Sequence, residues 1–178
     1  LGELVKAVVE SSEAEGGTRL DETNETRLVF CLELLVSVGI ENRDRLAPFW
    51  PTIRGQLRSV LLEQAKNAFL LERGVVGVLR LGTRLLLRED MGDEVMESLG
   101  LFRLLKVSAI RRLSPQITAG LHQLLRSNAA NIHSRAHWQL LFCLLEWSGA
   151  AAFPQRPQEA ESEEDADGEE SDREPVQE

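Results

Sequence analysis

The chain has 178 residues, of which 43% are hydrophobic and 28% are charged, and its formal net charge is −9 at pH 7. All of that net charge comes from residues 154–178, which carry eleven acidic residues and two arginines, so residues 1–153 are neutral with 18 basic and 18 acidic side chains. A neutral body argues against nucleic acid as a partner, because proteins that bind it usually carry a strong basic excess.

The composition divides the chain into two parts. Residues 1–153 are long enough to bury one hydrophobic core, and we expect them to form a single domain. Residues 154–178 contain one valine and no larger apolar side chain, so they cannot offset the entropy cost of ordering. We therefore expect a disordered acidic tail or linker there, with Ser162 and Ser171 as candidate phosphorylation sites beside acidic residues.

Two further features concern the compartment and the start of the chain. No apolar run approaches the roughly 18 residues that span a bilayer, and Cys31 and Cys143 lie in apolar helical runs, as small hydrophobic residues of a reducing compartment do. We expect a soluble, cytoplasmic protein. Because Leu1 already opens a helical apolar pattern, we also expect a segment of a longer chain that is truncated at its N-terminus.

Helical spacing of apolar residues recurs along the chain, and strict alternation, the mark of a half-buried strand, is absent. Asn24 as N-cap and Gly39 as C-terminal stop predict a helix over residues 25–38. A short turn over residues 42–47 precedes a helix that begins around Pro48 and Pro51 and carries Ile53, Leu57, Val60 and Leu61 inward. Further helices are expected over residues 67–88, 93–105, 114–127 (Ser114 as cap before Pro115) and 134–147 (Ser134 as cap, Gly149 as stop).

The helix starts have a period. Those near residues 24, 67 and 114 are about 43 and 47 positions apart, which is the spacing of HEAT and armadillo repeats. We therefore predict an all-α fold of stacked helical pairs, an α-solenoid segment. An irregular helical bundle is the alternative.

The predicted helix over residues 67–88 is apolar on most of its surface and needs neighbours on several sides. Its glycines at 74, 77 and 82 indicate close approach of those neighbours. At roughly 100° per residue, Arg73, Arg80, Arg84 and Arg88 fall within about 80° of one another. We call these four residues the arginine ribbon, which Arg103, Lys106, Arg111 and Arg112 are candidates to extend.

Three interpretations of the arginine ribbon stay open. It is a solvated helix edge bridged by Glu72, Glu89 and Asp90, or a contact with an anionic membrane surface, or a docking site for the acidic tail that phosphorylation would strengthen.

No residue pattern indicates catalysis or a cofactor. His133 and His137 have i, i+4 spacing, but the glutamate of a zinc-protease helix is missing between them and no ligand cluster accompanies them. There is no nucleophile motif and no glycine-rich phosphate loop. We expect no metal, no cofactor and no enzymatic activity in this chain.

Three strings resemble one family: LLERGVVGVLRL at 70–81, GLHQLL at 120–125 and, above all, NAANIHS at 128–134, followed by Trp138 and the run around Phe142. Together they resemble a helical homology region downstream of the catalytic domain in the large Golgi-type Arf guanine-nucleotide exchange factors, the brefeldin-A-resistance group. The resemblance covers nearly all of residues 1–153. The chain departs from it at Gly74 and Gly82, where the family usually has alanine.

The resemblance implies a function for the whole protein and a role for this segment. The whole protein would exchange GDP for GTP on Arf GTPases at the early Golgi and support retrograde traffic, through a separate domain with a catalytic glutamate that has no counterpart in this chain. The segment would be a HEAT- or armadillo-like regulatory region, peripherally associated with Golgi membranes. Its partners would be other domains of the same protein and anionic lipids, with Arf contacted only through the catalytic domain. A protein-interaction scaffold without lipid contact is the alternative.

The asparagine-rich string reads physically as a joint between helices. Asn128 and Asn131 are residue types that adopt left-handed conformations and bond exposed carbonyls at a helix end, and Ser134 suits the cap of the next helix. We expect Asn128, Asn131, His133 and Ser134 to have a structural role in preference to a partner-binding one.

Overall fold

The computed structural model describes residues 22–63 and 67–149, and it has helices and no strand within them. This confirms the all-α class. The α-helices are α2 (Glu22–Glu41), α3 (Trp50–Arg58), α4 (Ala68–Leu85), α5 (Gly92–Gly100), α6 (Val107–Arg112), α7 (Ser114–Asn128) and α8 (Arg135–Ser148). Short turns of other helix types join them: η1 (Arg43–Arg45), η2 (Ala47–Phe49), η3 (Ser59–Glu63), η4 (Glu89–Met91), η5 (Leu101–Leu104) and η6 (Ala129–Asn131). The predictions for the first helix and for the acidic tail lie outside the described residues.

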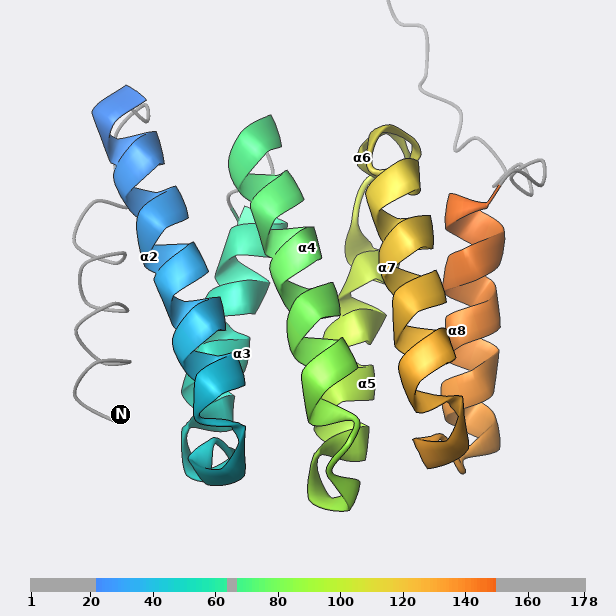
Figure 1. The fold of residues 1–178 in the computed structure, drawn as a ribbon. Helices are drawn as coiled ribbons and strands as arrows, with labels where there is room; N and C mark the ends of the chain where they lie inside the picture. Colours follow the sequence, from blue (N-terminus) through green and yellow to red (C-terminus); the bar gives the residue numbers. More distant parts are fainter. Residues whose placement is uncertain (1–21, 64–66, 150–178) are drawn as a thin grey trace, which may run out of the picture.

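The helices stack as pairs in two layers. Helices α2, α4 and α7 lie side by side in one layer, and α3, α5 and α8 form the layer behind them (Figure 1). The first layer holds the helices whose spacing gave the period, and α4 packs between α2 and α7. The stack of helical pairs is therefore as expected, while the assignment to the HEAT or armadillo class stays a prediction.

Helix α4 is the centre of the core. Asn67 caps it, since its side-chain oxygen accepts hydrogen bonds from the backbone N–H groups of Phe69 (3.1 Å) and Leu70 (2.9 Å). Its buried residues are Leu70, Leu71, Gly74, Val75, Gly77, Val78, Leu79, Leu81, Gly82 and Leu85. They cover all but one face of the helix, and the exposed face carries Arg80 and Arg84.

Glycines let the neighbouring helices approach α4 closely. A Cβ at Gly77 would lie 2.9 Å from Val36 of α2, and one at Gly74 would lie 2.8 Å from Val60 of η3. On the other side, Gly82 faces Leu124 of α7 with a corresponding distance of 3.2 Å. The expected close approach at the three glycines is confirmed.

Several predicted helix ends were wrong. Helix α2 includes Asn24 and continues through Gly39, so neither residue ends it. Glycine suits position 39 because Leu81 of α4 packs there: a Cβ would lie 3.1 Å from the Leu81 side chain. Helix α4 ends at Leu85, three residues before Arg88, whose backbone is extended.

The region after α4 is more broken than expected. The predicted helix over residues 93–105 is α5 followed by η5, and α6 was not predicted. The core residues predicted for residues 93–105 were nonetheless correct, since Val95, Met96, Leu99, Phe102 and Leu105 are buried. Ser114 is the first residue of α7 and caps nothing: Leu113 holds the cap position, and the Ser114 hydroxyl donates to the carbonyl of Ser148 at the end of α8.

Candidate functional site

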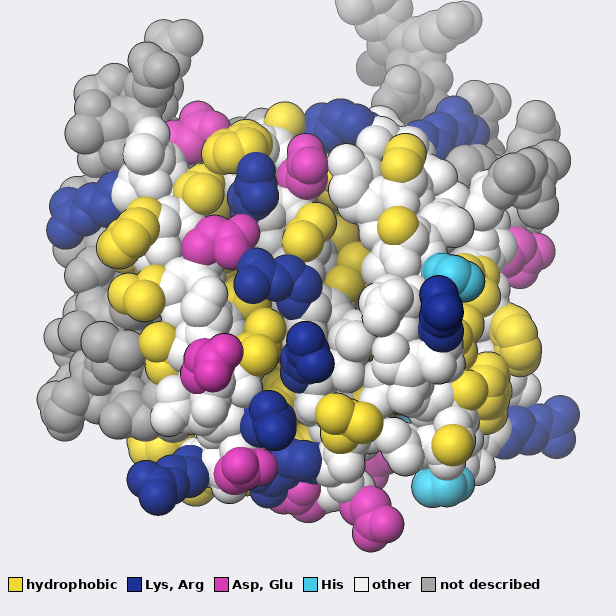
Figure 2. All heavy atoms as spheres, viewed as in Figure 1, with side chains coloured by type: hydrophobic (Ala, Val, Ile, Leu, Met, Phe, Trp, Pro, Cys, Tyr) yellow, Lys and Arg dark blue, Asp and Glu magenta, His cyan; other side chains and the backbone are white. Residues whose placement is uncertain are grey.

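The arginine ribbon lies on the exposed face of the layer formed by α2, α4 and α7. Figure 2 shows basic side chains in a column along α4 on this face. Glu33 of α2 serves two of them: its Oε2 lies 2.7 Å from Nη1 of Arg80, and its Oε1 lies 3.9 Å from Nη1 of Arg73. The ribbon is therefore bridged to α2 by one carboxylate.

Arg73 and Arg84 differ in how far they are engaged. The Arg73 guanidinium also lies over the ring of Phe69, at 4.9 Å from the ring centre, a cation–π contact. Arg84 is exposed, and no ion pair or hydrogen bond joins its side chain to another described residue. Arg84 is thus the ribbon residue that is open to a partner.

Arg88 departs from the ribbon because α4 has already ended. Its Nε and Nη2 atoms donate to both carboxylate oxygens of Asp90 (2.9 and 2.6 Å), and its Nη1 donates to the carbonyl of Arg43 (2.7 Å). The hydrogen bond from Arg88 lowers the pKa of Asp90 below the usual aspartate range and in turn raises the pKa of Arg88. Arg88 therefore ties the loop after α4 to η1.

The bridging acids were predicted only in part. Asp90 pairs as expected, whereas Glu72 faces α7, where it accepts a hydrogen bond from Gln116 (3.3 Å), and no bridge from Glu89 to an arginine is found in the described part of the chain. Glu33 was missed. Without the separate Arg88–Asp90 pair, the three arginines on α4 and their partner Glu33 have a net charge of 3 − 1 = +2.

The residues suggested as an extension of the ribbon lie elsewhere. Arg103 is in η5, Lys106 precedes α6, and Arg111 and Arg112 end α6. Helix α6 lies beside the end of α8 (Figure 1), whereas Arg73, Arg80 and Arg84 of the ribbon lie on α4. Arg103, Lys106, Arg111 and Arg112 are therefore basic residues separate from the arginine ribbon.

The asparagine corner joins three helices. Asn128 is fully buried at the end of α7, and its Nδ2 donates to the carbonyls of Leu124 (3.2 Å) and of Thr83 in the last turn of α4 (3.0 Å). The expected bonds to helix-end carbonyls are confirmed for Asn128. Its expected left-handed conformation is wrong, because its φ is −135° as the chain continues into η6.

The other three residues of the corner make few contacts at the start of α8. Asn131 is exposed and donates weakly to Oδ1 of Asn128 (3.4 Å), and His133 is exposed. Ser134 holds the N-cap position of α8, yet its side chain makes no capping hydrogen bond. The anchor that sequence reasoning missed is Trp138, whose indole N–H donates to the carbonyl of Ile132 (2.9 Å).

The other predicted features give little evidence for a functional site. Nε2 of His137 lies 3.2 Å from Oδ1 of Asp93. Within residues 22–63 and 67–149, no three histidine, cysteine or acidic side chains gather as metal ligands, and no helix is long and apolar enough to cross a membrane. Cys31 and Cys143 are half-buried free thiols. Ser162 and Ser171 lie outside the described residues.

Comparison with known proteins gives relatives that are much longer than this chain. It is 42% identical over 150 residues to the Caenorhabditis elegans "Golgi-specific brefeldin A-resistance guanine nucleotide exchange factor 1 homolog", a match that covers 83% of this chain and 8% of that protein. Two Arabidopsis thaliana proteins, the ARF guanine-nucleotide exchange factors GNL1 and GNOM, are 34% and 30% identical over 71% and 80% of this chain, and 9% and 10% of their own lengths.

The chain is homologous to a segment of large Arf guanine-nucleotide exchange factors. This confirms the resemblance carried by the three strings. The chain spans about a tenth or less of the exchange factors that it matches. No protein-family model matches it, and no solved structure matches it.

Proposed function

We propose that this chain is a non-catalytic regulatory segment of a large Arf guanine-nucleotide exchange factor in Golgi vesicle and retrograde traffic, at the cytoplasmic face of Golgi membranes. Three exchange factors contain a homologous segment, and the printed name of one is Golgi-specific. Its partners would be other domains of the same protein, and Arf would be contacted only by a catalytic domain elsewhere. Nucleic acid is not among the proposed partners.

The segment contributes by contacting an anionic membrane surface through the arginine ribbon. The observation that carries this proposal is the group of Arg73, Arg80 and Arg84 on one face of α4 with Glu33 as its carboxylate partner, and Arg84 has no ion pair with another described residue. Each cation near anionic headgroups contributes about 1 kcal/mol to binding. Phe69 beside Arg73 is 44% exposed and adds an apolar group to the same face. Such a contact is weak alone and assists other membrane contacts of the full-length protein.

A protein-interaction scaffold without lipid contact is the second candidate. Apolar side chains that are exposed away from the ribbon favour it: Leu104 in η5 (60% exposed) and Phe142 in α8 (59%). Exposed aromatic and aliphatic side chains are typical anchors of protein interfaces.

Nucleotide exchange on Arf tests the non-catalytic part. Arf loaded with fluorescent GDP is mixed with the 178-residue chain, and a catalytic domain of the same class serves as the positive control. We expect the chain alone to leave the spontaneous rate unchanged. A faster release of GDP would overturn the proposal.

Flotation with liposomes tests the membrane contact. The chain is floated with vesicles containing anionic phosphoinositides, beside the variant Arg80→Glu/Arg84→Glu. The matched control is Arg126→Glu/Arg135→Glu, which changes the charge equally at exposed positions of α7 and α8. We expect the parent and the control to float and the ribbon variant to stay behind. If none floats, or if all float equally, the ribbon is not a membrane contact and the scaffold becomes the better proposal.

A further inference from the structure

Charge is strongly segregated along the second half of the chain. Residues 98–145 contain six basic residues and no acidic one, whereas residues 154–178 carry a net charge of −9. Few residues separate the two blocks, so opposite charges are held close together by the chain itself.

Four of the six basic residues lie within ten positions of one another on η5 and α6, and we call them the basic end: Arg103, Lys106, Arg111 and Arg112. All four are exposed. No ion pair joins Arg103, Lys106 or Arg112 to another described residue. Glu97 is paired with Arg54, and Glu146 of α8 is the one carboxylate between residues 98 and 149.

Helix α8, the last described helix before the acidic segment, ends beside α6. Hydroxyls of Ser114 and Thr118, in the first turns of α7, both donate to the carbonyl of Ser148, the last residue of α8, and the Thr118 bond is 3.0 Å long. Because α6 directly precedes α7, the end of α8 lies next to α6 (Figure 1). Glu159, the first acid of the segment, is only eleven residues beyond Ser148. An extended chain of that length reaches about 36–40 Å, so every residue of the basic end is within range.

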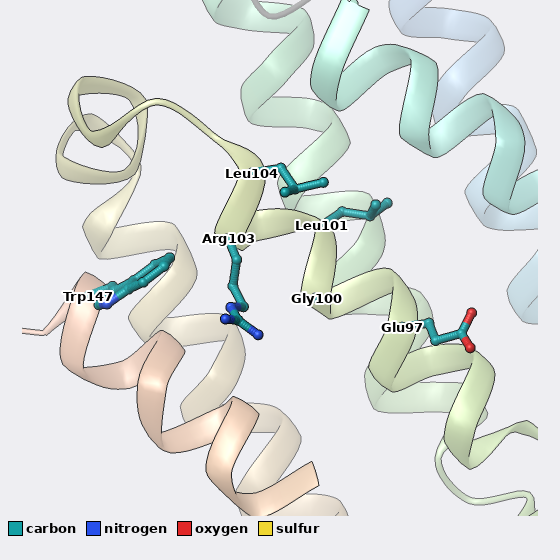
Figure 3. A pocket seen from close by; sticks show the side chains of 6 residues that line it. All are labelled: Glu97, Gly100, Leu101, Arg103, Leu104 and Trp147. Carbon is teal, nitrogen blue, oxygen red and sulfur yellow. The ribbon is translucent and has the colours of Figure 1, made fainter. Parts of the chain in front are cut away.

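An open depression of about 480 Å³ lies between η5 and the end of α8. Figure 3 shows the Arg103 side chain extending into this space, with the Trp147 ring across from it. Leu104 lines its rim and is 60% exposed. Glu97 also lines the depression, but its carboxylate is paired with Arg54. The unpaired cation of Arg103, beside an indole ring and an aliphatic side chain, suits a carboxylate-rich peptide with small apolar residues, which is the composition of residues 154–178.

We propose that residues 154–178 bind back onto the basic end of the same molecule and cover the depression beside Trp147. Tethering makes this contact intramolecular, so its effective concentration is in the millimolar range and weak charge–charge contacts suffice. The contact masks the basic end from other anionic partners, and displacement of the segment exposes it. Phosphorylation of Ser162 or Ser171 adds negative charge to the segment and strengthens the contact.

Zero-length cross-linking of the 178-residue chain tests this directly. A carbodiimide joins an amine to a carboxylate that touches it, and Lys106 supplies an amine within the basic end. Equal amounts of ¹⁵N-labelled and unlabelled chain are mixed, so that peptide masses separate links within one copy from links between copies. Protein unfolded in concentrated urea gives the background that the tether alone produces.

The variants decide where the segment binds. Arg103→Glu/Arg112→Glu leaves Lys106 in place and reverses two exposed charges, so links from Lys106 to residues 159–178 should fall about tenfold. The matched variant Arg80→Glu/Arg84→Glu should leave them unchanged. Circular dichroism checks that both variants keep the parent's helicity.

Three results would overturn the proposal. Links from Lys106 no more frequent than in urea would show that the segment does not bind there. Loss of the links in the ribbon variant, with retention in Arg103→Glu/Arg112→Glu, would place the segment on the arginine ribbon. Links mainly between copies would show association between molecules in place of the internal contact.

Discussion

Asn128 donates a hydrogen bond of 3.0 Å from its buried side-chain amide to the backbone carbonyl of Thr83, 45 positions away. Thr83 lies in the last turn of α4, where carbonyls have no partner within the helix. The same amide group also bonds Leu124 of its own helix. One side chain thus satisfies a carbonyl at the end of the central helix and fixes α7 against it. This structural role accounts for an asparagine at position 128.

Replacement of Asn128 by alanine should destabilise the fold. The change leaves the part-buried carbonyl of Thr83 and the buried carbonyl of Leu124 without their side-chain donor, at a cost of about 1–3 kcal/mol in the free energy of unfolding. Urea denaturation followed by circular dichroism measures this. Asn131→Ala is the matched control and should cost less than about 0.5 kcal/mol, because Asn131 is exposed and its bond is long. Equal effects of the two variants would show that the Thr83 bond does not matter.

Gly120→Ala should also destabilise, for a steric reason. A Cβ at Gly120 would lie 2.5 Å from Cδ1 and 3.0 Å from Cβ of Leu79, so α7 would have to move away from α4. Overpacking of this kind costs about 1–3 kcal/mol. Gly55→Ala in α3 serves as the control, since nothing lies within 4 Å of its Cβ position, and it should stabilise by about 0.5–1 kcal/mol. Thermal melts of both variants compare the signs, and a stable Gly120→Ala would contradict the close packing.

The pair of Arg88 and Asp90 should appear in the pH dependence. Arg88 lowers the pKa of Asp90, so the folded state binds this proton less readily than the unfolded chain. The contribution to stability is therefore present above the ordinary aspartate pKa and is lost as the pH falls through the lowered value. Carbon-13 NMR of the carboxyl group measures the pKa directly. Arg88→Gln should bring it back toward the ordinary range, and an unchanged value would show that Arg88 is not the cause.

Periodicity predicted the main helices and most of the core because apolar spacing directly reflects which face of a helix is buried. Helix ends were harder. Gly39 looks like a stop in isolation, but contact with Leu81 of α4 keeps it inside α2. Helix α6 was not predicted because Ile110 is its one buried residue, and a single buried residue gives no periodic pattern.

The candidate site shows the same limit. Wheel geometry placed Arg73, Arg80 and Arg84 on one face correctly, whereas Arg88 was included only because the helix was extended past Leu85. Glu33 could not be found from local spacing, because it is 47 positions from Arg80 and meets it only when α2 packs on α4. The corner string indicated the family resemblance. The hydrogen-bond partner of Asn128 in α4 could be identified only from the fold.

Phosphorylation of the acidic segment should tighten its contact with the basic end. Ser162→Glu/Ser171→Glu adds two negative charges, and more salt should then be needed to halve the Lys106 cross-link yield, because screening must offset a stronger attraction. Ser162→Gln/Ser171→Gln is the neutral control and should behave as the parent does. An identical salt dependence in all three proteins would show that charge at these two serines does not affect the contact.

The most direct test of the membrane proposal uses Glu33, the carboxylate that partly neutralises the ribbon. Binding to anionic vesicles is measured for the parent, Glu33→Gln and Arg84→Glu at one salt concentration. Removal of one negative charge should raise vesicle binding about 5-fold, at about 1 kcal/mol per charge, and Arg84→Glu should lower it by more. Glu33→Gln should cost less than about 1 kcal/mol of stability, because its pairs are near the surface. Binding in the order Glu33→Gln, parent, Arg84→Glu is the predicted result; equal binding of all three, or none, would contradict a membrane contact through the arginine ribbon.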